Sequence, residues 1–215
     1  MMIAGLRRSH LVIAGLAWLC AGPALADVFV RSDIITDPAP GKFSVCHGFS
    51  CAQVTQVGLN DSQWFTITSV FERAAATPEE ERAQIAQAIG KFETVVGVLT
   101  GTSGDLGENS IRGLDLSGQM DCIDESTNTT TYLRILTKAG FLRWHRVEDR
   151  VTRGWFLFGW PHTTAVVSER ESGKRWAIDS WFFANGHPAA IAPLEVWQRG
   201  WRPGKATETA TPLPQ

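Results

Sequence analysis

The sequence predicts an α+β fold in one domain. Helical patterns over residues 78–101 and 121–138 are followed by a strand–turn–strand pattern over residues 163–181. Helices followed by strands that pair locally are typical of the α+β class. About 190 residues would remain after removal of the signal peptide described below, a length that suits one domain with a substantial core.

The first helix has clear signals at both ends. Thr77 can cap its N-terminus, Pro78 suits the first turn, and Glu80 would complete a capping box. The helix is expected to end near Gly101. Between these ends, apolar residues recur at helical spacing: Ile85, Ala88, Ile89, Phe92, Val95, Val96 and Leu99.

The second helix is expected to begin near Asp121 and to end at about Lys138, where Gly140 would stop it. A glycine-rich loop over residues 102–118 precedes it. Loops of this length are often functional.

Alternating patterns predict the strands. One strand is expected over residues 144–151, and segments 163–167 and 175–181 are expected to pair antiparallel around a turn at 171–174. Residues 61–75 fit either a helix or a strand.

The N-terminus reads as a secretory signal peptide over residues 1–26. Positive residues precede a short apolar run over 11–19, and the small residues at 24–26 suit signal peptidase cleavage. The apolar run is too short to span a bilayer, so no membrane anchor is expected. We expect a periplasmic or secreted protein with a domain over residues 27–202 and a disordered tail over 203–215.

Charge and motif content exclude several partner classes. The formal net charge is −2 with both signs interspersed, and no basic stripe suggests nucleic acid as a partner. No nucleotide-binding loop, metal-ligand cluster or cofactor motif is recognisable, so no cofactor is expected. The sequence does not indicate which oligomeric state the protein adopts.

Three cysteines remain after the expected cleavage: Cys46, Cys51 and Cys122. The short loop between Cys46 and Cys51 can close into a disulfide in an oxidising compartment. A metal site that uses Cys46, His47 and Cys51 is the rival interpretation, although its spacing is unusual. A bridge from Cys122 to Cys46 or Cys51 is a third possibility. If Cys46 pairs with Cys51, Cys122 is left as a free thiol.

Cys122, His162 and Asp179 occur in an order that suits thiol catalysis. A helix N-terminus depresses the pKa of a cysteine, and Cys122 is expected at such a position. His162 precedes one strand of the expected hairpin and Asp179 ends the other, so both should lie near the same end. A carboxylate there can orient an imidazole whose second nitrogen faces the thiol.

Several segments resemble bacterial transglutaminase-like cysteine proteinases. The likeness lies in Met120-Asp121-Cys122-Ile123-Asp124, in Pro161-His162-Thr163-Thr164-Ala165-Val166 and in Trp176-Ala177-Ile178-Asp179-Ser180. The resemblance implies a papain-like core in which the helix that carries the cysteine packs on an antiparallel sheet. It also implies a Cys122–His162–Asp179 triad.

The expected activity is hydrolysis or acyl transfer at peptide or isopeptide amide bonds, with a peptide or protein substrate and a thioester intermediate. The backbone N–H of Cys122 is the natural first oxyanion donor. Candidates for the second donor are Gln119, Gln63 and the Trp64 indole. Trp160 and Trp181 are candidates to line the substrate cleft. The alternative is a catalytically silent module on the same fold that binds a peptide or glycan.

Overall fold

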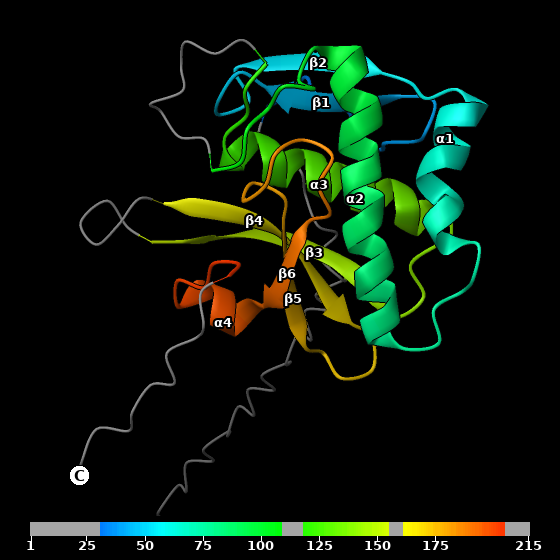
Figure 1. The fold of residues 1–215 in the computed structure, drawn as a ribbon, viewed down its shortest axis with the longest axis vertical. Coiled ribbons are helices and arrows are strands. Elements are labelled where there is room, and N and C mark those ends of the chain that lie inside the picture. The colour runs from blue at the N-terminus through cyan, green and yellow to red at the C-terminus, as the bar shows by residue number, and fades with distance from the viewer. Residues whose placement is uncertain (1–30, 109–117, 155–160, 205–215) are drawn as a thin grey trace, which may run out of the picture.

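The computed structural model describes residues 31–108, 118–154 and 161–204. The predicted signal peptide over 1–26, Trp160 and most of the predicted tail over 203–215 lie outside these residues. The described residues form an α+β structure with antiparallel sheets, as the sequence predicts. Figure 1 shows a small two-stranded sheet at the top, a larger sheet below, and helix α3 (Cys122–Lys138) between them, with α2 (Pro78–Thr100) upright alongside.

Two helices precede the catalytic candidates. The ambiguous segment forms α1 (Asp61–Thr68) and a short 3₁₀ turn, η1 (Ser69–Phe71), so its helical alternative is correct. The predicted first helix is α2 (Pro78–Thr100), and Gly101 ends it in the left-handed conformation, with φ 78°.

The N-terminus of α2 differs from the prediction in one detail. The Thr77 side chain accepts from the Glu80 N–H as expected. The Glu80 carboxylate, however, accepts from the Ala76 N–H at 2.8 Å instead of returning to Thr77.

Helix α3 (Cys122–Lys138) begins at Cys122, with Asp121 as its N-cap. Asp121 accepts from the N–H groups of Ile123 and Asp124, and the Asp124 carboxylate accepts from the Asp121 N–H at 3.2 Å. This reciprocal arrangement is a capping box built from two aspartates. It fixes the direction of the first helical turn, where the candidate nucleophile lies.

The buried middle of α3 is rich in hydroxyl side chains. Residues 126–131 are all buried. Hydroxyls of Thr127, Thr130 and Thr131 donate back to helix carbonyls one turn earlier. Because their hydroxyls are satisfied within the helix, these residues can be buried without leaving unpaired polar groups.

The larger sheet has the order β3-β4-β5-β6 and is antiparallel throughout. Its strands are β3 (His145–Arg153), β4 (His162–Glu169), β5 (Arg175–Asp179) and β6 (Ala190–Pro193). The predicted hairpin is therefore present as β4 and β5, although β5 ends at Asp179 instead of 181. Strand β6 was not predicted.

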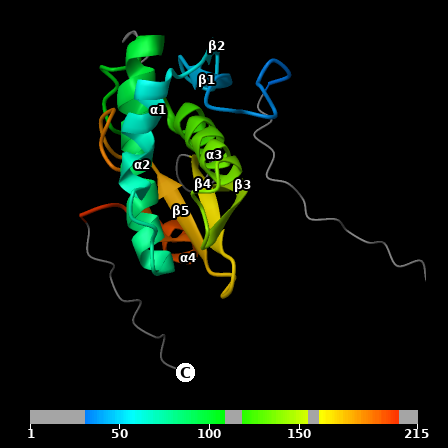
Figure 2. The same cartoon turned by 90° about the vertical axis from the view of Figure 1, so that its right-hand side faces the viewer.

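The smaller sheet pairs β1 (Phe43–His47) with β2 (Gln53–Val57). Helix α3 lies between this hairpin and the larger sheet, where it contacts both β1 and β4. Figure 2 shows the same arrangement from the side, with α1 and α2 together on one side of α3. The helix that carries Cys122 is therefore packed on an antiparallel sheet.

The core occupies both faces of the larger sheet. Alternate residues such as Ala165 and Val167 point toward the main core, which α2 and α3 also fill. Val166 points to the opposite face, where it packs beside Trp197. That face is covered by α4 (Leu194–Gln198). Among the described residues, no helix is both long and apolar enough to cross a membrane.

Candidate functional site

Cys122 is the first residue of α3 and is a half-buried free cysteine. The backbone N–H groups of Thr163 and of Cys122 itself interact with its sulfur and favour the thiolate. Thr163 is the residue after His162, so α3 and β4 bring the sulfur and the histidine segment together.

The pKa of Cys122 is raised to about 11, so the expectation of a depressed pKa was wrong. Burial of the sulfur is the largest cause, and the negative charges of Asp121 and Asp179 add to it. The helix N-terminus favours the thiolate, but desolvation outweighs that effect here. At pH 7 Cys122 is therefore a neutral thiol.

His162 and Asp179 form a buried pair at the ends of β4 and β5. His162 Nε2 lies 2.7 Å from Asp179 Oδ2. Because a carboxylate only accepts, Nε2 carries the proton in this hydrogen bond. His162 Nδ1 is buried and has no hydrogen-bond partner among the described residues. An imidazole in this state offers an unprotonated nitrogen that can act as a base.

Aromatic rings surround His162. Ring centroids of Trp181, Phe182 and Trp197 lie 4.5, 5.5 and 5.5 Å from the imidazole centroid. The predicted cleft residue Trp181 therefore lies beside the candidate base. Trp160, the other predicted cleft residue, lies outside the described residues.

Trp197 is the site residue that the sequence analysis missed. Its indole N–H donates to Asp179 Oδ2 at 2.7 Å, and its side chain is fully buried. The contact joins α4 to the end of β5, and only the fold brings the two together. The sequence itself offers only the tryptophan, with no local pattern that links it to Asp179.

Gln119 lies just before the N-cap of α3, and its side chain holds the preceding loop. Its Nε2 donates to the Gly104 carbonyl at 2.7 Å, and its Oε1 accepts from the Leu106 N–H at 3.1 Å. These bonds compete with the predicted donation to an oxyanion, which stays a prediction.

The predicted disulfide between Cys46 and Cys51 is present. Both sulfurs are thereby used, so the rival metal site over Cys46, His47 and Cys51 is wrong, as is a bridge to Cys122. No cluster of potential metal ligands occurs in the part of the chain that the structure describes.

The disulfide loop also packs against the start of α3. Backbone N–H groups of Phe49 and Cys51 donate to the Asp124 carboxylate at 2.8 and 2.6 Å. The Ser50 N–H donates to Asp121 Oδ2 at 2.9 Å. Phe49, Ser50 and Cys51 all have positive φ, which turns their N–H groups toward the two aspartates. The loop therefore holds the first turn of the helix that carries Cys122.

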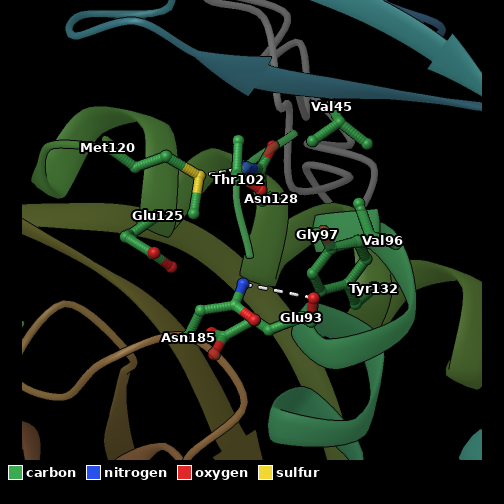
Figure 3. A pocket seen from close by; sticks show the side chains of 10 residues that line it. All are labelled: Val45, Glu93, Val96, Gly97, Thr102, Met120, Glu125, Asn128, Tyr132 and Asn185. Carbon is green, nitrogen blue, oxygen red and sulfur yellow. Dashed lines mark hydrogen bonds between the residues drawn. The ribbon is translucent and has the colours of Figure 1, made fainter. Parts of the chain in front are cut away.

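A small cavity lies within the core beside α3. Figure 3 shows Glu93 of α2 and Glu125 of α3 among the side chains that line it. It offers about 10 Å³, the room of one water molecule and too little for a substrate. Ser180 donates to Glu125 Oε2, whereas Glu93 Oε1 has no hydrogen-bond partner among the described residues.

Both cavity carboxyls favour their protonated form. Burial raises the pKa of Glu93 to about 8, and the negative charge of Asp105 adds to the shift. Burial and the charge of Glu93 also raise the pKa of Glu125 well above its usual value. At neutral pH the pair therefore retains a proton inside the core.

A second buried histidine, His145, has a different environment. Its Nδ1 lies 2.8 Å from Glu81 Oε1. Glu81 also accepts from backbone N–H groups of Arg143, Trp144 and His145. His145 Nε2 lies 3.5 Å from Arg82 Nη1. Since both ring nitrogens have partners, His145 ties α2 to β3 and offers no free base.

Comparison of the chain with protein-family models returned no match. Comparisons with curated proteins and with solved structures returned no match either.

Proposed function

We propose that this protein is an exported thiol-dependent hydrolase or acyltransferase that acts on peptide or isopeptide amide bonds. The core would be papain-like, with Cys122 as nucleophile, His162 as general base and Asp179 as the group that orients the imidazole. The observation that carries the proposal is the His162–Asp179 pair, whose second imidazole nitrogen is buried and has no hydrogen-bond partner among the described residues.

The chemistry begins from a neutral thiol, because the pKa of Cys122 is raised to about 11. His162 Nδ1 accepts the thiol proton as Sγ attacks the substrate carbonyl carbon. The imidazolium formed would be stabilised by Asp179, and it would stabilise the thiolate in turn. The N–H of Cys122 supports the oxyanion of the tetrahedral intermediate.

Collapse of the intermediate completes acylation. The C–N bond breaks, and the imidazolium gives its proton to the departing amine. Cys122 Sγ then carries the acyl group as a thioester. In the second half, His162 takes a proton from water or from an acceptor amine as that group attacks the thioester. The products are the free thiol and an acid or a new amide.

Alkylation of Cys122 tests this proposal. At pH 7 the rate with iodoacetamide should fall by about 100-fold in His162→Ala, in line with removal of a general base. His187→Ala is the matched control, since His187 is exposed and should leave the rate unchanged. Equal rates in wild type and His162→Ala would remove His162 from any role in thiol activation.

One observation favours a second candidate function. The thiol is half-buried and its pKa is raised, a state that suits an inert cysteine. The chain would then be a silent module that binds a peptide or glycan through the aromatic residues near His162, such as Trp181 and Phe182. Binding that survives Cys122→Ala, without His162-dependent alkylation, would select this alternative.

A further inference from the structure

Trp197 has no role in the proposed reaction as described above, yet it contacts the same carboxylate oxygen as the candidate base. Asp179 Oδ2 accepts from His162 Nε2 and from Trp197 Nε1, each at 2.7 Å. The Trp197 ring is fully buried, and its centroid lies 5.5 Å from that of His162. The indole therefore fixes both the position of Asp179 and the packing of the imidazole.

Arg153 holds Trp197 in place. The Arg153 guanidinium lies 4.3 Å from the centroid of the Trp197 ring and donates to the Trp197 carbonyl. The same Nη1 donates to the Trp201 carbonyl at 2.9 Å. Arg153 ends β3 and pairs with His162 in the sheet register. Strand β3 thus anchors α4 beside the His162–Asp179 pair.

The hydrogen bond from Trp197 also has an electrostatic consequence. An N–H donor on a carboxylate stabilises the negative charge and lowers its tendency to attract another proton. Asp179 Oδ2 divides its acceptor capacity between an indole and an imidazole. The indole therefore limits how strongly Asp179 can stabilise the imidazolium, while it keeps the carboxylate in the orientation that His162 needs.

We infer that Trp197 is a positioning residue for the proposed Cys122–His162–Asp179 reaction, and that its indole N–H tunes the basicity of His162 through Asp179. This inference rests on the proposed function. Trp197 acts through Asp179 and is not assigned any contact with substrate.

Trp197→Phe tests the inference because it keeps an aromatic ring and removes the N–H. The rate of Cys122 alkylation at pH 7 should fall by about 10-fold, the loss expected for one hydrogen bond to a charged group. The inflections of the rate–pH profile should move to higher pH by about half a unit, since Asp179 then stabilises the imidazolium more strongly.

Trp176→Phe is the matched control. The Trp176 indole also donates to a carboxylate, Glu169 Oε1 at 3.0 Å, and lies on the same strand as Asp179. Its substitution should leave the profile in place, because Glu169 does not contact His162. If the rate–pH profile of Trp197→Phe superposes on that of wild type, the inference is overturned. The proposed function still stands in that case, provided that alkylation is slow in His162→Ala. Equal alkylation rates in wild type and His162→Ala would instead overturn the proposed function.

A measurement on variants that keep Trp197 covers the case in which Trp197→Phe does not fold. In wild type, one indole N–H resonance should exchange slowly with solvent, because it is buried and bonded to Asp179. In Asp179→Asn the same resonance should exchange faster, since the acceptor loses its charge. Indole exchange rates that are identical in the two proteins would contradict the inference.

Discussion

At the scale of single residues, the site depends on two side chains: a thiol that its surroundings keep protonated and an imidazole that can accept a proton. Burial and nearby carboxylates keep Cys122 protonated, whereas His162 Nδ1 has no hydrogen-bond partner in the part of the chain that the structure describes. The sequence located both residues, because a helix start and a hairpin are readable from local patterns. It could not supply the pKa of Cys122, since burial depends on how α3 meets β4 and β5.

The raised pKa of Cys122 leads to a prediction for the protein without the histidine. In His162→Ala, the alkylation rate of Cys122 should keep rising beyond pH 9, because the pKa of the isolated thiol lies near 11. Thiolate absorbance at 240 nm, with Cys122→Ala as the blank, gives the same titration directly. A plateau reached near pH 8.5, the ordinary thiol value, would show that burial does not control this group.

At the scale of elements, the first turn of α3 is fixed both by its own capping box and by the disulfide loop. Asp121 and Asp124 form a capping box and also accept from the disulfide loop. The sequence predicted the helix start and the disulfide. It gave no indication that the two features touch, because residues 49–51 and 121–124 meet only through the packing of β1 on α3.

Removal of the disulfide should therefore affect both stability and reactivity. Cys46→Ser/Cys51→Ser should lower the free energy of unfolding by about 2 kcal/mol, as expected for a short closed loop. The alkylation rate of Cys122 should change with it, because the loop holds the first turn of α3. Urea unfolding and iodoacetamide kinetics measure the two effects.

Reduction of the wild-type protein is the control for the serine substitutions, since it opens the same loop without new side chains. An alkylation rate that stays the same in both cases would mean that Asp121 and Asp124 hold the helix start without help from the loop.

At the scale of the whole molecule, α2, α3 and the loop after α2 enclose a cluster of buried carboxyls. The sequence predicted α2 from its apolar stripe, and Glu93 lies within that helix. Nothing local indicates that Glu93 faces the core with Glu125 and Asp105. Such a cluster arises only when α2, the loop after it and α3 come together, which is why sequence reasoning did not find it.

The cluster predicts how stability depends on pH. Glu93 has a folded-state pKa of about 8, above its unfolded value of 4.5, so between these values the folded state binds the extra proton. The free energy of unfolding should therefore fall as pH rises from about 5 to 8, by up to about 1.4 kcal/mol per unit for this group. Glu93→Gln should flatten that dependence.

Urea unfolding at pH 5 and pH 7.5 checks this prediction. Glu79→Gln, which removes an exposed charge from the first turn of the same helix, should keep the wild-type slope. A Glu93→Gln protein with an unchanged slope would place the buried proton on Glu125 instead.

The central claim is that Cys122 carries an acyl group with the help of His162. Intact-mass measurement after reaction with an activated acyl ester tests it most directly. The account predicts one acyl adduct per chain, mapped to Cys122, formed at pH 7 in wild type and at least about 100-fold more slowly in His162→Ala. No adduct on Cys122, or equally fast formation in both proteins, would contradict it.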